Sequence, residues 1–140
     1  MILLSSHTEL LRIYFDEVHN NGNFDQIGEI IHPQFVLHHA GGEEYVTLEQ
    51  AIEITKMYLS SFPDMHFRIE QVIEKVDKVV VQTTFTGTHK GPMLNIPATG
   101  KSVVIQNVHI FRLENGKISE VWLYRDDLGL MRQLGVISIE

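Results

Sequence analysis

Glu120-Val-Trp-Leu-Tyr-Arg-Asp-Asp-Leu-Gly-Leu-Met-Arg-Gln-Leu-Gly135 is the stretch from which the fold of this chain is most readily inferred. Its first half alternates, and side chains two apart on a strand share a face, so we expect Trp122, Tyr124 and Asp126 to line one surface. Its second half, 128–134, has the apolar spacing of a short helix that ends at Gly135.

The two adjacent carboxylates at this strand–helix junction have two interpretations. A carboxylate beside aromatic walls is a candidate general base. Aspartate is also a favoured N-cap, so Asp126 or Asp127 is equally a candidate to cap the helix. Because the residues are paired, one can cap while the other faces a cavity.

Length and composition indicate one globular domain over residues 1–140. The chain is 44% hydrophobic and 21% charged, which is ordinary for a globular protein. Its formal net charge of −7 argues against nucleic acid as a partner. No apolar run approaches the roughly 20 residues of a membrane span. The absence of cysteine excludes a disulfide, a thiol nucleophile and a thiolate metal site. We expect a cytoplasmic protein without a membrane partner.

Hydrophobic periodicity changes from helical to alternating near residue 63. Apolar spacing predicts helices over Thr8–Asn21, Phe24–Ile31 and Leu48–Phe62, the third with a capping box at its start. Alternation predicts one short early strand and then a meander of four long ones: 35–39, 66–76, 79–89, 101–113 and 117–125. A turn is expected at Asp77-Lys78. Helices followed by a strand meander indicate an α+β fold.

The expected strand 102–113 is apolar on both faces. One face carries Asn107 and His109 among apolar residues, and the other carries Val104, Val108 and Ile110. We therefore expect both faces to be covered, one by the three N-terminal helices around a cone-shaped cavity and the other by a second copy. The sequence thus predicts a homodimer formed through the sheet.

Motifs along most of the chain resemble the SnoaL-like polyketide cyclase family, within the nuclear transport factor 2-like superfamily. They are Phe62-Pro-Asp64, Phe85-Thr-Gly-Thr-His-Lys-Gly91, Ile96-Pro-Ala-Thr-Gly-Lys101, His109-Ile-Phe-Arg112, Asn115-Gly-Lys-Ile118, Glu120-x-Trp122 and Asp126-x-x-Gly-Leu-x-x-Gln-Leu-Gly135. The resemblance implies a cone-like α+β barrel, usually dimeric, with a pocket inside the cone.

The resemblance also implies a chemistry. Characterised cyclases of the family close a polyketide ester ring by intramolecular aldol condensation, with no metal or cofactor and with an aspartate as acid and base. The matching Trp-x-x-x-Asp spacing places that role on Asp126 and leaves the cap to Asp127. His109, on the inward face, would orient the aspartate or steady an enolate.

Further candidates for the pocket each have a plain structural alternative. Trp122, Tyr124, Tyr14, Met57 and Phe62 would supply apolar walls, or simply pack in the core. Asn107 would bond a ligand or the backbone.

The remaining candidates are two histidines and a loop. By resemblance His38 lines the pocket, or it is a packed polar residue; His89 closes the pocket mouth or is structural. The loop 90–100, with Met93 and Leu94, is a lid or a dimer contact. No set of Asp and His residues has metal-ligand spacing, so no metal is expected.

The leading hypothesis is therefore a cofactor-free enzyme acting on a small apolar carbonyl compound. The alternatives are an isomerase or hydratase that uses the same carboxylate, and a non-catalytic protein that binds a small apolar molecule.

Overall fold

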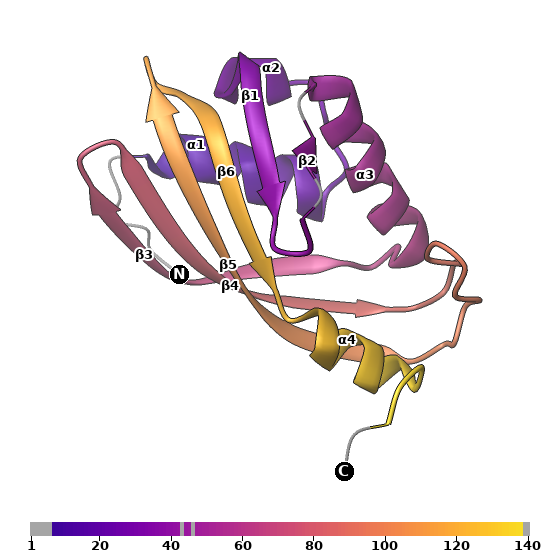
Figure 1. Ribbon diagram of the computed structural model, residues 1–140. Coiled ribbons are helices and arrows are strands. Elements are labelled where there is room, and N and C mark those ends of the chain that lie inside the picture. The colour runs from indigo at the N-terminus through magenta and orange to yellow at the C-terminus, as the bar shows by residue number, and fades with distance from the viewer. Residues whose placement is uncertain (1–6, 43, 46, 139–140) are drawn as a thin grey trace.

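The computed structural model, which describes residues 7–42, 44–45 and 47–138, is built on one curled sheet. Six strands lie in the order β2-β1-β6-β5-β4-β3, and the helices α1, α2 and α3 cover one face (Figure 1). The expected α+β class is confirmed. The sheet is strongly curved but does not close, so β2 and β3 are its edges.

The N-terminal half holds the helices and two of the strands. Helix α1 (Thr8–Leu11) continues directly into the π-helix η1 (Arg12–Asn20), and α2 (Ile27–Ile30) is a single turn. Strands β1 (Ile31–His39) and β2 (Glu44–Tyr45) follow, and then α3 (Leu48–Ser61).

Two features of this half differ from the prediction, and one agrees with it. The second helix is shorter than predicted and the first strand longer, because a residue before proline avoids helical geometry and His32 precedes Pro33. At α3 the expected capping box forms. The side chain of Thr47 accepts a hydrogen bond from the backbone N–H of Gln50, and the side chain of Gln50 accepts one from the backbone N–H of Thr47.

The C-terminal half is the predicted meander. It comprises β3 (His66–Lys75), β4 (Lys78–Thr88), β5 (Ser102–Glu114) and β6 (Lys117–Arg125), each antiparallel to the next, and ends in α4 (Asp127–Leu134). The first turn lies at Val76-Asp77, one residue before the expected position. At the last turn, Asn115 and Gly116 both have positive φ (54° and 78°), which suits the twist of a two-residue hairpin.

A β-bulge at Ser119 sets which side chains of β6 face the helices. Glu114 pairs with Lys117 and Leu113 with Ile118, but Arg112 pairs with Glu120, so Ser119 is an extra residue. Its hydroxyl donates to the carbonyl of Arg112 at 3.1 Å. Beyond the bulge, odd-numbered residues of β6 lie opposite odd-numbered residues of β5.

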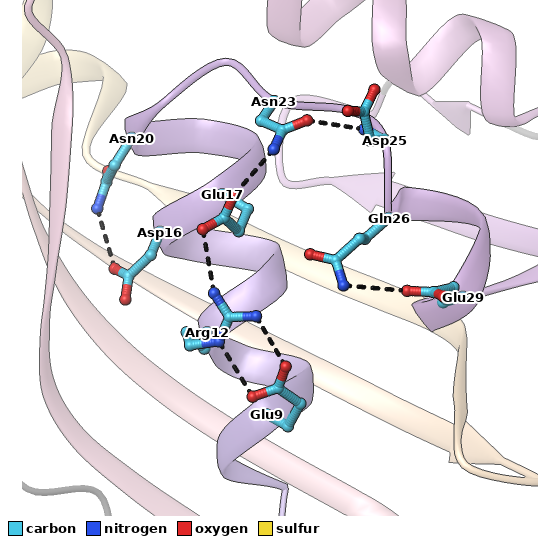
Figure 2. A network of polar contacts seen from close by, with 9 residues as sticks. All are labelled: Glu9, Arg12, Asp16, Glu17, Asn20, Asn23, Asp25, Gln26 and Glu29. Atoms are coloured by element: carbon cyan, nitrogen blue, oxygen red, sulfur yellow. Dashed lines mark hydrogen bonds and ion pairs between the residues drawn. The ribbon is translucent and has the colours of Figure 1, made fainter.

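A chain of polar contacts fixes the N-terminal helix to the segment that follows it (Figure 2). Arg12 donates to both Glu9 and Glu17, and Asn23 in turn donates to Glu17. The side chain of Asn23 also accepts from the backbone of Asp25. This network lies on the outer side of the helix and leaves the apolar side of the helix to face the sheet.

Asn20 joins the end of η1 to the edge strand β3. Its side-chain oxygen accepts from the backbone N–H of Phe67 at 2.7 Å, and its amide donates to the Phe67 carbonyl at 3.1 Å. The two bonds imitate the pairing of a neighbouring strand. They hold the helix at a fixed depth in the curl of the sheet, where Tyr14 and His19 reach its interior.

The other face of the sheet carries apolar side chains that the helices do not cover. Val104 is 56% exposed and Tyr124 is 52% exposed. Occupation of this face by a second copy stays a prediction. No helix in the described part of the chain is long and apolar enough to cross a membrane.

The face assignment of β6 can be tested with two truncations. Val121 is 1% exposed and faces the helices, so Val121→Ala should lower the free energy of unfolding by about 2 kcal/mol through lost burial. Tyr124→Ala should change it by only about 0.5 kcal/mol. Urea unfolding of both variants at one protein concentration measures the difference, and the reverse ranking would contradict the bulge.

Candidate functional site

The curl of the sheet encloses a cavity of about 340 Å³ between the sheet and the helices. Its walls are mostly apolar and come from η1, β1, α3, β5 and β6. The apolar and aromatic lining includes Val18, Ile31, Phe35, Leu37, Leu48, Ile54, Met65, Phe67, Phe85, Val121 and Leu123. A cavity of this size and character suits a small, largely apolar molecule.

One side of the cavity is polar, and three of its polar atoms have no hydrogen-bond partner. Asn107 lies directly across from Arg125 in the β5–β6 pair, and His109 is two residues along from Asn107 on the same face. Four buried side-chain polar atoms of the described residues have no hydrogen-bond partner, and three belong here: Asn107 Oδ1, His109 Nδ1 and Arg125 Nε. Buried polar groups are usually paired, so this cluster indicates a binding site.

The imidazole of His109 is held by an aromatic cage. The rings of Phe15, Phe67 and Phe111 lie 5.0, 5.7 and 6.0 Å from it, and its Nε2 lies 3.2 Å from Thr83 Oγ1. Burial lowers the pKa of His109 to about 3, and the positive charges of Arg125 and, in acid, of protonated His19 add to the effect. His109 is therefore neutral at pH 7, with its ring orientation fixed.

His19 and Tyr14 add two more neutral polar groups to the wall. Burial lowers the pKa of His19 to about 4 and raises the pKa of Tyr14 well above its usual value. His19 Nδ1 lies 2.6 Å from the carbonyl of Tyr14. No aspartate or glutamate is among the described residues that line the cavity. In the same described part, no three His, Asp or Glu side chains gather in a metal-binding arrangement.

Four of the residues predicted from the sequence line the cavity: Tyr14, Met57, Asn107 and His109. Two others are buried but lie outside its lining. Phe62 packs in the second core cluster, and the His89 ring lies 5.4 Å from it with Nδ1 bonded to Thr99. His89 is thus absent from the cavity lining, and its Nε2 is the fourth buried polar atom without a hydrogen-bond partner.

Three predicted pocket residues lie on the opposite face of the sheet. Trp122 and Tyr124 follow the bulge and point away from the helices, so their expected place in the pocket is wrong. His38 stacks on Trp122 at 5.5 Å and contacts both Glu44 and Glu120 at 2.6 Å. The bonds to Glu120 and Glu44 raise the pKa of His38.

Asp126 also lies outside the cavity. Its side chain accepts from the backbone N–H of Gly129 at 2.8 Å and caps α4, so the assignment of the cap to Asp127 is wrong. Asp126 is exposed and is absent from the cavity wall. The physical reason is again the bulge, which turns Asp126 to the same face as Trp122 and Tyr124.

Sequence reasoning missed Arg125 and His39, both of which line the cavity. The half-exposed carboxylate of Asp127, considered from the sequence as a cap or as a cavity-facing group, lies 3.4 Å from Arg125 Nε and 3.8 Å from His39 Nε2. The available signal for Arg125 was its position after Val121 and Leu123 on the same side of an alternating strand.

The loop 90–100 contributes one side chain to the cavity. Backbone bonds from Lys90 and Gly91 to the carbonyl of Ser61 dock the loop on the end of α3. Leu94 lines the cavity and is 79% exposed, whereas Met93 is buried in the core. An exposed Leu94 at the cavity is compatible with both predicted roles of the loop, a lid and a dimer contact, so each stays a prediction.

The curved sheet, the helices on one face and the cavity of about 340 Å³ between them define a protein of the cone-shaped α+β class. The model of the SnoaL-like polyketide cyclase family matches residues 9–134, and the chain belongs to this family.

Its relatives and structural neighbours agree with this assignment. The chain is 27% identical to the aklanonic acid methyl ester cyclase of Streptomyces peucetius, covering 94% of this chain and 92% of that protein. It is also 27% identical to the nogalonic acid methyl ester cyclase of Streptomyces nogalater, over 83% of this chain and 88% of that one. A crystal structure from Jannaschia sp. CCS1, described as SnoaL-like, superposes with a TM-score of 0.86 at 27% identity, over 99% of this chain and 100% of that chain.

The cap assignment predicts a stability difference between two Asp126 variants. Asp126→Ala should lower the free energy of unfolding by about 1 kcal/mol, because the N–H of Gly129 loses its acceptor. Asp126→Asn keeps an acceptor and should lower the free energy of unfolding by only roughly 0.3 kcal/mol. Equal losses in urea unfolding would show that the cap is elsewhere.

The buried histidines predict a loss of stability in acid. His19 and His109 have folded-state pKa values of about 4 and about 3, below their usual 6.5, so the unfolded chain binds more protons below pH 6.5. Their contribution is complete above pH 6.5 and is lost as the pH falls through 4 towards 3, at up to about 1.4 kcal/mol per pH unit for each.

His109→Phe isolates one of these contributions. The variant keeps an aromatic ring in the cage and should show a shallower slope of unfolding free energy between pH 6.5 and pH 4. An unchanged slope in a series of urea titrations would mean that His109 is not a buried neutral group.

Proposed function

We propose that this chain is a cyclase-type enzyme that holds a mostly apolar carbonyl compound in the cavity and acts on it by acid–base chemistry without a cofactor. The observation that carries the proposal is the set of three unpartnered polar atoms, on Asn107, His109 and Arg125, at one side of an apolar cavity. These atoms supply an acceptor, an imidazole nitrogen and a charged donor to a ligand whose remainder contacts apolar walls.

An intramolecular aldol closure fits these groups. A proton leaves the carbon next to one carbonyl, the enolate carbon forms a bond to a second carbonyl carbon, and the resulting alkoxide takes up a proton. His109 Nδ1 is the group placed to accept and return that proton, and Arg125 donates to the enolate or alkoxide oxygen. Asn107 Oδ1 accepts from a ligand hydroxyl.

The low pKa of His109 bears on this role. An imidazole with a pKa of about 3 is neutral and able to accept a proton, but it is a weak base. An anionic enolate oxygen beside the ring favours the protonated form and raises the pKa as the reaction proceeds. Asp126 takes no part in the proposed mechanism, because its carboxylate caps α4 outside the cavity.

A non-catalytic binding protein is the second candidate function. The observation that favours it is the lack of a carboxylate among the described lining residues, since the acid–base role expected from the sequence required one. An isomerase or hydratase would use the same polar groups and differ in its product.

Turnover of a relative's substrate separates these candidates. Aklanonic acid methyl ester, taken from the name of the Streptomyces peucetius relative, should be converted to a ring-closed isomer of equal mass, resolved by liquid chromatography and mass spectrometry. His109→Leu should reduce the rate by about 100-fold or more while calorimetry still detects binding. His66→Ala, which changes an exposed histidine on β3, is the matched control and should leave the rate unchanged.

Two results would contradict the proposal. An unchanged rate in His109→Leu would exclude His109 as the proton carrier. Tight binding of the ester with no conversion by the unaltered protein would favour the binding-protein function.

A further inference from the structure

Arg125 is the side chain with a permanent charge among the described residues that line the cavity. It is the last residue of β6, opposite Asn107, and its side chain is only 9% exposed. Its guanidinium carbon sits 4.3 Å from the centre of the Tyr58 ring, which also lines the cavity. The aromatic ring holds the guanidinium plane in place and shields one side from water.

The buried charge of Arg125 is only partly compensated within the chain, by the side chain of Tyr58 and the half-exposed carboxylate of Asp127. Asp127 Oδ1 is 3.4 Å from Nε, which is ion-pair distance, but no hydrogen bond joins these atoms and Nε has no partner. The Asp127 side chain is 48% exposed, so water weakens its attraction for the guanidinium. The buried histidines of the cavity wall, His19 and His109, are neutral at pH 7 and carry no charge that could pair with Arg125. A buried cation with so little compensation favours an anionic ligand.

We propose that the preferred ligand carries a free carboxylate that pairs with Arg125, so that this protein binds a mostly apolar carboxylic acid more tightly than the matching ester. This inference rests on the proposed function in assuming that the cavity binds a small molecule. A guanidinium presents N–H donors in a planar fork that matches a carboxylate, whereas a methyl ester offers no charge.

The proposal sets this chain apart from the named relatives it resembles. Those proteins are called methyl ester cyclases. Here the apolar walls would hold the hydrocarbon part of the acid, Arg125 its carboxylate, and Asn107 and His109 the reacting oxygen atoms. The positive charge of Arg125 contributes to the lowered pKa of His109. A ligand carboxylate at Arg125 would offset this effect and make His109 a stronger base.

Matched acids and esters test the proposal by direct binding. The probes are 2-naphthoic acid and decanoic acid with their methyl esters, titrated calorimetrically at pH 7 into the full chain. We expect at least one acid to bind about tenfold or more tightly than its own ester, the scale of a charge-assisted hydrogen bond in a shielded site.

Four variants test whether the preference for an acid over its ester depends on the charge of Arg125. Arg125→Gln should remove it, and Arg125→Lys should keep part of it because the charge remains. Asp127→Asn should strengthen acid binding, since it removes the carboxylate that competes for Arg125. Arg132→Gln makes the same change in net charge at an exposed position of α4 and should leave the preference unchanged.

Each remaining outcome overturns the proposal in a recognisable way. Esters that bind as well as or better than their acids would refute the carboxylate while leaving the proposed function intact. Failure of every acid and ester to bind would refute the carboxylate proposal, whereas the proposed function would still be decided by turnover of aklanonic acid methyl ester. An acid preference that survives in Arg125→Gln, or weakens in Asp127→Asn, would place the anion site elsewhere. If Arg125→Gln does not fold, Arg125→Lys and Asp127→Asn still decide the question.

Discussion

One extra residue in β6, Ser119, determines which side chains of that strand line the cavity. The two-residue turn at Asn115-Gly116 would, in a regular hairpin, place Trp122 and Tyr124 opposite His109 and Asn107. The bulge at Ser119 shifts the pairing by one residue, so Leu123 and Arg125 occupy those positions instead. Because successive side chains on a strand alternate between faces, a shift of one residue exchanges the whole set. The cavity thereby gains a cation and loses two aromatic rings and a carboxylate.

The same shift creates a polar network on the outer face. Trp122 stacks on His38 there, and Glu120 contacts both His38 and Arg112, at 2.6 and 3.1 Å. These groups satisfy one another, in contrast to the polar atoms inside the cavity. The network of His38, Glu120 and Arg112 is thus paired within the chain on the outer face, whereas three unpartnered polar atoms of Asn107, His109 and Arg125 lie on the inner face.

The unpaired polar atoms in the cavity carry an energetic cost. A buried donor or acceptor without a partner costs about 1–3 kcal/mol, and three such atoms lie within two neighbouring strands. Elsewhere in the described core the buried polar side chains are largely bonded, as Ser61 is to Met57 and Pro92. A cost concentrated in one place, in an otherwise well-packed domain, is typical of a functional site.

Local sequence patterns determined the elements of this protein and one wall of its site. The period-two strands of the meander, the capping box at Thr47 and the inward face of β5 with Asn107 and His109 all follow from interactions within a few residues or from regular alternation. The inward face of β6, the cap at Asp126 and the parallel pairing of β1 with β6 did not follow from the sequence. The pairing of β1 with β6 joins segments distant in the chain, and the cap at Asp126 is a local choice between two adjacent aspartates that the sequence left open. The face of β6 depends on a single bulged residue, which changes the register without changing the hydrophobic pattern on which the prediction relied.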